Sequence, residues 1–263
     1  MGGAAHLVTS GAGPVKAQEG AVVKGQAESG QGVQGRRAIP RTIAIDGPAG
    51  AGKSTIADAL AHRLNYLYFD TGVLYRAVTL AALRRSLAVT DHAALGTLVK
   101  QLHIDVRPPT VADGRSLTVL LDDEDVTWAI REPDVDRNVS TVSAQPEVRQ
   151  ALLQRQREVA ARGGIIMAGR DIGTVVLPDA DLKLYLEATP GERARRRAVE
   201  EQGRGLERSF NEVLSDIARR DDVDSHRAVS PLYPAADAII IDTDAMGIDE
   251  VLARIEQLVA GER

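Results

Sequence analysis

The chain has 263 residues, 44% of them hydrophobic and 3% aromatic, and it carries a formal net charge of −5 at pH 7. This length suffices for one substantial domain with a small insert or lid, and the acidic balance argues against a general binder of nucleic acid or of anionic membranes. The chain has no cysteine, which excludes disulfides, thiolate zinc sites and cysteine nucleophiles, and no run approaches the roughly 18 apolar residues of a membrane-spanning helix.

Residues 1–38 are predicted to form a disordered N-terminal extension. They are rich in Gly, Ala, Gln and Val and contain no Phe, Trp or Tyr, so little apolar area is available to offset the entropy of ordering. They also lack the apolar segment of a signal peptide. We therefore expect the folded domain to occupy residues 39–263.

A phosphate-binding loop follows the first predicted strand. The run GPAGAGKS at 47–54 fits the pattern G-x-x-x-x-G-K-[ST], between an apolar β-branched stretch at 42–45 and a helix-forming stretch at 55–64. A glycine-rich turn with a solvent-facing lysine is the alternative, and the strand–loop–helix context argues against it. Lys53 is expected to reach the β- and γ-phosphates, and Ser54 to bind Mg²⁺ directly or through water. The residues expected to bind ATP are Gly47, Pro48, Ala49, Gly50, Ala51, Gly52, Lys53, Ser54 and Thr55.

A second strand, predicted at 66–69, ends in polar residues that suit another substrate. Asp70 and Thr71 follow it directly, and Arg76 lies in the helix that comes next. Ligands of open α/β sheets bind outside the carboxyl ends of the strands, so we expect these residues at a second binding site. Without that context, a surface arginine would be the simpler interpretation of Arg76.

Residues 105–137 are predicted to be a small β-rich insert. Apolar and polar residues alternate at 104–107, Asp113 and Gly114 are a hairpin signal, and a second strand follows at 117–121. Trp128, the one tryptophan of the chain, is expected to be a packing anchor.

A predicted helix at 146–162 leads to a third buried strand at 165–168. The next residues, 169–173, read Gly-Arg-Asp-Ile-Gly and place an arginine beside an aspartate at a strand end. Arg170 could bind phosphate, and Asp171 could accept a hydrogen bond from the amino group of a base. A local ion pair in a turn is the alternative.

Two charged helices follow a fourth predicted strand at 182–186. They are interrupted by a glycine-containing tip, and this arrangement predicts a lid at 190–227. In the second helix, Arg220, Asp224 and Arg227 stand at i, i+4 and i+7 and so share one face. A fifth strand and an amphipathic helix are predicted at 237–243 and 248–259.

Five strand–helix alternations with a phosphate loop at the first turn predict an α/β fold with a doubly wound, mostly parallel five-stranded sheet. Arginines come from four separate segments of this chain, at 76, 170, 193–197 and 220–227. A kinase needs such cations because it holds a second anion and neutralises charge on the transferring phosphoryl group. The sequence therefore favours a kinase over a nucleotide-binding switch without an acceptor.

Several segments together resemble the bacterial cytidylate kinases, which are nucleoside monophosphate kinases with a phosphate loop. The segments are IDGPAGAGKST, FDTGVLYR, AGRDIGTVVLPDADLKLYL, ERARRR, RRDDVDSHRAVSPLYPAADA and IIIDT, and the resemblance extends from about Arg41 to the C-terminus. The first segment alone indicates only a P-loop NTPase, whereas the combination of GRD-x-G-T with the later arginine-rich pattern is far more specific. The resemblance implies transfer of the γ-phosphate of ATP to CMP or dCMP with Mg²⁺, a CMP-binding insert at 105–137 and a short lid.

The resemblance also implies roles for individual residues. Ser140, Arg149 and Asp171 would read the cytosine, Arg76, Arg170 and Arg227 would hold the CMP phosphate, Arg220 and Asp224 would hold the ribose, and Thr71 would line the site. The catalytic groups expected from it are Lys53, Arg170, Arg193 and Arg227. The family usually has an acidic residue before Gly169, where this chain has Ala168. We therefore expect Asp70 or Asp46 to take that part near Mg²⁺.

The expected partners are ATP and CMP or dCMP, with no nucleic acid and no membrane, and a monomer in the cytoplasm is expected. A UMP/CMP-type or adenylate-type kinase is the alternative within the same class. Comparing CMP, UMP and AMP as acceptors would separate these possibilities.

Overall fold

The described part of the chain is built on one large sheet. The computed structural model describes residues 39–203, 205–206 and 208–261, so the predicted extension at 1–38 lies outside the described residues. In chain order the elements are β1 (Thr42–Asp46), α1 (Lys53–Leu64), β2 (Leu67–Asp70), α2 (Gly72–Arg84), α3 (His92–Gln101), β3 (Ile104–Arg107), β4 (Thr118–Leu121), β5 (Glu124–Asp125), η1 (Ala129–Arg131), α4 (Pro133–Ser143), α5 (Pro146–Ala160), β6 (Ile165–Ala168), η2 (Ile172–Val176), β7 (Leu182–Glu187), α6 (Pro190–Gly203), α7 (Phe210–His226), β8 (Ile239–Asp242) and α8 (Ile248–Val259). Of these, η1 is a 3-10 helix and η2 is a π-helix.

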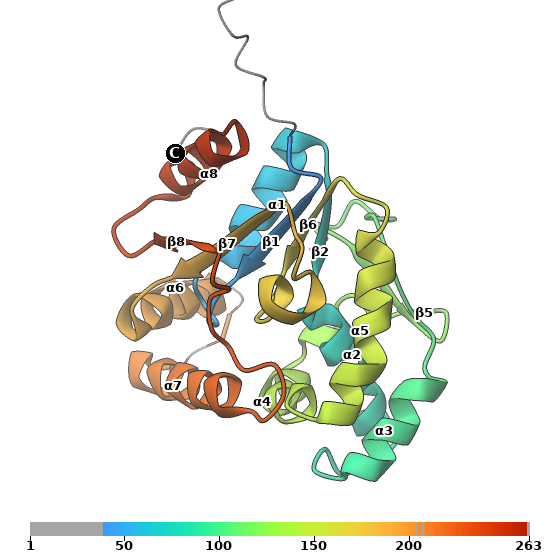
Figure 1. Cartoon of the computed structure of the whole chain (residues 1–263). Helices are drawn as coiled ribbons and strands as arrows, with labels where there is room; N and C mark the ends of the chain where they lie inside the picture. Colours follow the sequence, from blue (N-terminus) through green and yellow to red (C-terminus); the bar gives the residue numbers. More distant parts are fainter. Residues whose placement is uncertain (1–38, 204, 207, 262–263) are drawn as a thin grey trace, which may run out of the picture. The chain divides into compact units, whose positions relative to one another are not determined.

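The large sheet has five parallel strands in the order β2-β6-β1-β7-β8 (Figure 1). This confirms the predicted α/β fold with a mostly parallel five-stranded sheet. Because the strands are parallel, the loops that follow them meet at one edge of the sheet. Strand β1 is the central one, so the loop after it stands in the middle of that edge.

Helices cover both faces of the sheet. Successive side chains of a strand point to opposite faces, and in these strands the side chains on both faces are mostly apolar. Ile43 and Ile45 of β1 are fully buried against α1 and α8, whereas Ala44 between them belongs to the core formed with α2 and α5. In β6, Ile166 joins the first core and Met167 the second. A strand buried on both faces reads as a continuous apolar run, as this sequence does.

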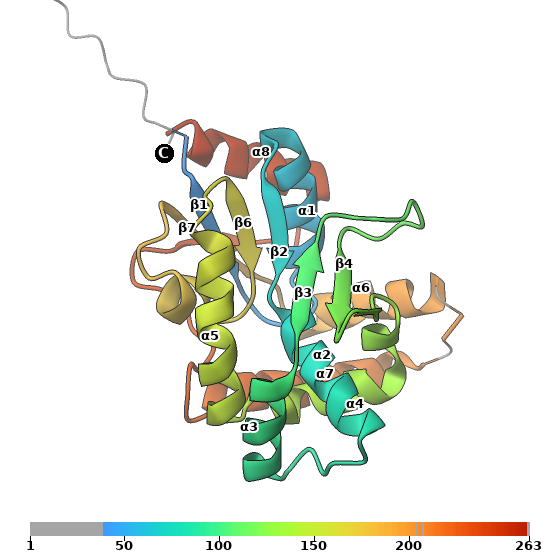
Figure 2. The same cartoon turned by 90° about the vertical axis from the view of Figure 1, so that its right-hand side faces the viewer.

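A second, smaller sheet lies in the predicted insert. Strand β4 pairs antiparallel with β3, as Figure 2 shows, and also with the short strand β5. Before β4, the guanidinium of Arg115 pairs with Asp113 at 2.7 Å and with Asp125 at 2.5 Å. The expectation that Trp128 is a packing anchor is wrong, because its side chain is 51% exposed and its indole N–H donates to Asp113 at 2.9 Å.

The two charged helices predicted at the lid are α6 and α7. They pack on each other through Ala194, Val213 and Ile217. Ser209 and Glu212 form a reciprocal capping box that begins α7. Helices α3, α4 and η2 were not predicted from the sequence.

Within the ranges that the structure describes, no helix is both long enough and apolar enough to cross a membrane.

Candidate active site

The loops at the carboxyl edge of the large sheet enclose a cleft with two parts. The larger part, about 760 Å³, lies along the loop before α1, the first turns of α6 and residues 243–248. The smaller part, about 230 Å³, lies between α2, α4, α7 and residues 168–171. Lys53, Ser54 and Asp70 line both parts. Two ligands bound in this cleft would therefore meet beside the start of α1.

The phosphate loop at the centre of the cleft depends on its glycines. Gly47, Gly50 and Gly52 have positive φ angles of 146°, 80° and 85°, a region that residues with a side chain rarely adopt. A Cβ on Gly47 would lie 2.0 Å from the carbonyl oxygen of Leu186 in β7. Helix α1 begins directly after Gly52, so the unpaired N–H groups of its first turn lie at the cleft.

Lys53 is a buried cation at the meeting point of the two parts. It is 7% exposed, and its ammonium group donates to the carbonyl oxygen of Pro48 at 2.7 Å. Burial, together with the guanidinium of Arg170, lowers the pKa of Lys53 well below its ordinary value. An anion bound beside this group would favour its charged form, so Lys53 is suited to bind phosphate.

Ser54 and Asp70 place oxygen atoms beside the loop. The Ser54 hydroxyl lies 3.3 Å from Asp70 Oδ2, and Asp70 is the register partner of Ala168 on the adjacent strand β6. The carboxylate of Asp70 thus stands one strand away from the position where an acidic residue is missing. Asp46, the other candidate, is buried and accepts two backbone N–H bonds. Of the two acids, Asp70 is the one that contacts Ser54.

Hydroxyl and carboxylate oxygens are ligands that Mg²⁺ accepts, so this corner fits that ion. The described residues contain no group of three or more His, Asp or Glu side chains that could hold a metal ion. A cation beside Ser54 would therefore take most of its oxygen ligands from bound phosphates and water.

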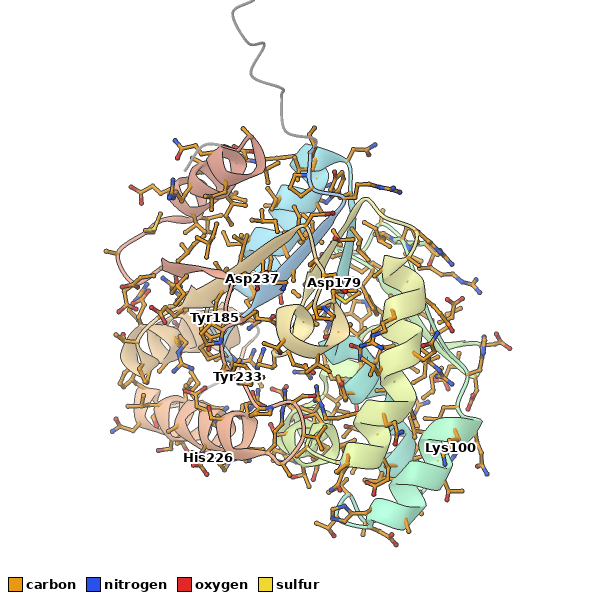
Figure 3. All side chains as sticks on the ribbon, viewed as in Figure 1. Lys100, Asp179, Tyr185, His226, Tyr233 and Asp237 are labelled. Carbon is orange, nitrogen blue, oxygen red and sulfur yellow. The ribbon has the colours of Figure 1, made fainter. Side chains whose placement is uncertain are left out.

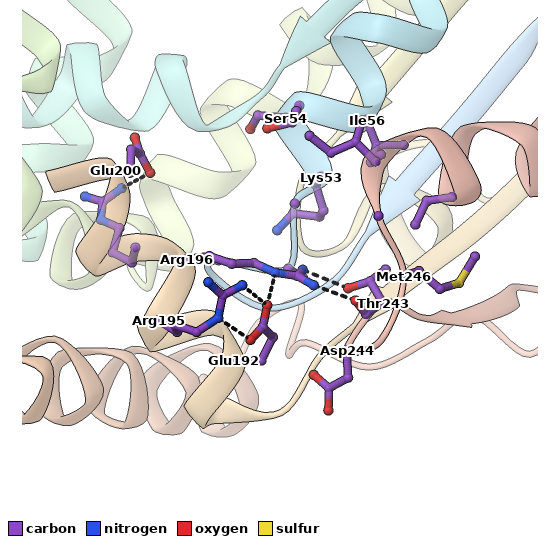
Figure 4. A pocket seen from close by; sticks show the side chains of 18 of the residues that line it. Lys53, Ser54, Ile56, Glu192, Arg195, Arg196, Glu200, Thr243, Asp244 and Met246 are labelled. Atoms are coloured by element: carbon purple, nitrogen blue, oxygen red, sulfur yellow. Dashed lines mark hydrogen bonds and ion pairs between the residues drawn. The ribbon is translucent and has the colours of Figure 1, made fainter. Parts of the chain in front are cut away.

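The far end of the larger part is built by α6 and the segment after β8. Arg196 donates to the hydroxyl and carbonyl oxygens of Thr243 at 3.0 and 2.5 Å, and it pairs with Glu192 at 2.8 Å (Figure 4). Arg195 pairs with the same glutamate at 2.7 Å. Met246 also lines this end. A planar guanidinium and an apolar side chain can enclose a flat base.

Asp136 on α4 is shared by arginines from three other helices. Its carboxylate pairs with Arg76 of α2 at 2.5 Å and with Arg197 of α6 at 2.8 Å, and it lies 3.6 Å from Arg220 of α7. Burial alone would raise the pKa of Asp136, but these guanidinium groups outweigh it and hold the pKa at about 2. The sequence reasoning missed Asp136 and included Arg197 only as a member of the arginine cluster at 193–197, without a role of its own. One signal was available, because Asp136 stands four residues before Ser140 and so shares a helix face with it.

The inner end of the smaller part contains a buried ion pair. Arg149 is 6% exposed and Asp171 is 5% exposed, and Nη2 of the arginine donates to Oδ2 of the aspartate. The guanidinium also donates to the carbonyl oxygen of Ser143 at 3.0 Å and lies over the ring of Tyr75, 5.3 Å from its centroid. Ser140 lines the same part of the cleft. The structure thus brings Ser140, Arg149 and Asp171 together.

Asp224 links two further arginines of this part. It accepts from Arg170 Nε at 2.8 Å and lies 3.7 Å from Arg227 Nη1. Burial alone would raise the pKa of Asp224, but Arg170 and Arg227 lower it. Arg227 also lies 3.6 Å from Asp171. This position is at the inner end of the cleft, whereas Arg227 was expected beside the acceptor phosphate with Arg76.

Thr71 and Arg193 complete the set of predicted residues. Thr71 is 4% exposed, lines the smaller part and donates to the carbonyl oxygen of Ala168 at 3.1 Å. Arg193 was expected to be catalytic, but it lines neither part of the cleft. Its guanidinium donates to the carbonyl oxygen of Ala49 at 3.0 Å and pairs with Asp221 at 2.6 Å. Arg193 thus contacts the phosphate loop at the Ala49 carbonyl.

Comparisons with known proteins agree with this geometry. A family model described as "Cytidylate kinase" matches residues 43–261, which include every residue of the cleft. The cytidylate kinase of Chloroflexus aggregans is 51% identical over 217 residues, covering 82% of this chain and 93% of the relative. The cytidylate kinase of Herpetosiphon aurantiacus is 51% identical over 223 residues, covering 85% and 96%. That of Desulfitobacterium hafniense is 51% identical over 216 residues, covering 82% and 91%.

Proposed function

The chain belongs to the cytidylate kinase family, and from this premise we propose how its residues divide the work between two nucleotides. The enzyme transfers the γ-phosphoryl group of ATP to CMP or dCMP and releases ADP and CDP or dCDP. We propose that 39–263 is one kinase domain, in which 105–137 is the CMP-binding insert and 190–227 is the lid region. The separate antiparallel sheet and the two charged helices support this division.

ATP is proposed to occupy the larger part of the cleft. Its phosphates would lie in the loop of residues 47–52, where backbone N–H groups and the start of α1 favour negative charge. Lys53 would leave the carbonyl of Pro48 and bind the β- and γ-phosphates. The adenine would lie beside Arg196 and Met246 at the far end.

CMP is proposed to place its base at the inner end of the smaller part. Asp171 would accept a hydrogen bond from the exocyclic amine of cytosine, which uracil cannot donate. Arg149 and Ser140 would bind the neighbouring polar edge of the base. Because Arg227 lies beside Asp171, we assign it to the base end of the site and not to the phosphate. There its positive charge would neutralise the carboxylate of Asp171.

The acceptor phosphate and ribose are proposed to lie nearer the start of α1. Arg76 and Arg170 would hold the phosphate, and Arg197 adds a third cation from α6. Arg220 and Asp224 would hold the ribose hydroxyls, with the carboxylate accepting and the guanidinium donating.

Transfer requires an oxygen of the CMP phosphate to attack the γ-phosphorus of ATP while the bond to the bridging oxygen of ADP breaks. Positioning and charge neutralisation supply most of the catalysis in such reactions. Lys53 and Arg170 stand where negative charge spreads over the transferring group. Mg²⁺, held through Ser54 with Asp70 nearby, would neutralise charge on the donor phosphates. Arg193 would act indirectly, by holding the loop.

The partners proposed are these small nucleotides alone. A monomer is proposed as the working unit. The use of ATP suits a cytoplasmic enzyme.

One observation carries the acceptor assignment, namely the buried Arg149–Asp171 pair at the inner end of a cleft that begins at the phosphate loop. The test is ADP production from Mg-ATP with CMP, dCMP, UMP or AMP as acceptor. We expect strong turnover with CMP and dCMP and weak turnover with UMP and AMP. Asp171→Asn should lose most of this preference, whereas Asp179→Asn, an exposed carboxylate nearby, should retain it.

Comparable turnover with UMP would point to a kinase of broader specificity and contradict the base-reading role of Asp171. Turnover of ATP that does not depend on any acceptor would contradict the whole assignment and favour a nucleotide-binding switch.

A further inference from the structure

Asp46 is a buried carboxylate that the proposed transfer does not use. It is the last residue of β1, directly before Gly47, and it is 4% exposed. Its Oδ1 accepts from the backbone N–H of Ile172 at 2.8 Å, and its Oδ2 accepts from that of Gly173 at 2.7 Å. These N–H groups belong to the first turn of η2, which begins immediately after Asp171.

The bonds to Asp46 replace a local helix cap. The first N–H groups of a helix have no partner within it, and an aspartate at the N-cap usually accepts one of them with its own side chain. Asp171 occupies the N-cap of η2, yet its side chain makes no such bond. Its carboxylate instead contacts Arg149 and Arg227. The cap of η2 is therefore supplied by strand β1, and the carboxylate of Asp171 makes its contacts within the cleft.

We propose that Asp46 is a positioning residue for the acceptor site, which caps η2 and thereby keeps the carboxylate of Asp171 turned toward the cytosine. Without this cap, the N–H groups of Ile172 and Gly173 would be buried donors with no acceptor, which is costly. The side chain of Asp171 is the local group that could turn onto them, as aspartates in turns commonly do. That movement would withdraw Asp171 from the base. The inference rests on the proposed reading of cytosine by Asp171.

The surroundings of Asp46 make its charge state sensitive to pH. The titratable groups that face it from the packed elements are Lys53, Asp171, Lys183 and Tyr185. Tyr185, which Figure 3 labels on β7, is its register partner across the sheet. Burial raises the pKa of Asp46 to about 6, against the two backbone hydrogen bonds that lower it. A protonated Asp46 has one acceptor oxygen fewer and so resembles an asparagine at this position.

The test compares the kcat/KM for CMP with that for UMP in Asp46→Asn. Asparagine keeps the shape of the side chain, but its amide nitrogen faces one of the two N–H donors. We expect the CMP preference to fall at least about tenfold through a higher KM for the acceptor, with the KM for ATP changed less than about twofold. The double variant with Asp171→Asn should show the same preference as Asp171→Asn alone, because the two residues act as one unit.

Asp181→Asn is the matched control. Asp181 is exposed and accepts the backbone N–H groups of Arg41 and Thr42 at the opposite end of β1, at 2.8 and 2.9 Å. Asp181→Asn should lower the stability of the protein without changing its preference for CMP over UMP. An unchanged preference in Asp46→Asn, an equal fall in Asp181→Asn, or an equal rise in the KM for ATP would each overturn the inference.

The wild-type enzyme supplies the remaining measurements. A wild type that does not prefer CMP would overturn the proposed function itself, which distinguishes that failure from a failure of Asp46 alone. If Asp46→Asn does not fold, the wild-type preference is measured between pH 7.5 and 5.5, where we expect it to fall as Asp46 becomes protonated. Both acceptors carry the same titrating phosphate, so the ratio cancels its contribution. A constant ratio over this range would overturn the inference.

Discussion

Replacing Asp136 with asparagine tests whether this carboxylate substitutes for a bound phosphate. The carboxylate pairs with Arg76 and Arg197 and lies near Arg220, with 16–25% of each of these four side chains exposed. Its pKa falls from 3.8 to about 2, which corresponds to about 2 kcal/mol of stability at pH 7. Because the pKa is lowered, this stability is present above pH 4 and is lost as the pH falls through about 2. Asp136→Asn should remove this stability wherever the wild type has it.

The loss should be smaller when CMP is bound. Without the ligand, Asp136→Asn leaves three guanidinium groups with less counter-charge, and we expect the melting temperature to fall by about 5 °C. A bound phosphate restores that charge, so at saturating CMP the difference from the wild type should shrink to less than half. Thermal unfolding followed by circular dichroism measures the difference in melting temperature between variant and wild type, both with and without CMP.

Asp134→Asn is the control for this experiment. Asp134 lies on the same helix and pairs with Arg137 at the surface, where both side chains are about two-thirds exposed (67% and 66%). Exposed ion pairs contribute little to stability, so the melting temperature of Asp134→Asn should differ from that of the wild type by less than about 1 °C. An equal loss with and without CMP in Asp136→Asn would refute the idea that phosphate takes the place of the carboxylate, and so would no loss at all.

Three further predictions concern the loop, the metal and pH. Gly47→Ala should abolish turnover and the stabilisation by ATP in thermal unfolding, because its Cβ would lie 2.0 Å from the Leu186 carbonyl oxygen; near-normal activity would contradict the strained geometry of the loop. Ser54→Ala and Asp70→Asn should each raise the Mg²⁺ concentration for half-maximal rate about tenfold or more, and a Mg²⁺ titration that matches the wild type would exclude them from the metal site. The raised pKa of Asp46, about 6, means that the folded state holds this proton more tightly than the unfolded state. Its contribution to stability should therefore fall by about 2 kcal/mol as the pH rises from 4.5 to 7.5. Urea unfolding at pH 4.5 and 7.5 should show this loss in the wild type but not in Asp46→Asn.

The sequence predicted those parts of the structure that depend on local patterns. The five strands of the large sheet, the phosphate loop and α8 each have a short apolar period or a fixed motif, and all were found in the expected order. The π-helix η2 was missed because five residues are too few for a helical period to be recognised. Helix α4 was missed because its buried positions are valines and a serine, which have no strong helix preference.

The site was predictable only where a residue acts close to its own motif. The placement of Asp136 depends on α2, α4, α6 and α7 meeting at one point, which no local pattern records. The contacts of Arg193 could not be predicted for the same reason, because only the fold shows that its guanidinium donates to Ala49 and pairs with Asp221. Resemblance to a family assigned Arg227 to the acceptor site, whereas our proposal for the end of that site rests on its distance to Asp171, which no local pattern records.

The central place of β1 in the sheet has a consequence for biosynthesis. Thr42 pairs with Ile165 on one side and Ile43 pairs with Leu182 on the other. Strand β1 therefore cannot pair with its neighbours until β6 and β7 have been synthesised, much later in the chain. Pairings this distant in sequence slow folding, because a long loop must close before any contact rewards it. A nascent chain cannot complete the cleft that carries both nucleotides until β8 and residues 243–248 have left the ribosome. Since ligands stabilise only the folded state, ATP and CMP can promote folding late in synthesis but not early. Chains truncated before β7 should therefore lose the fold and nucleotide binding together.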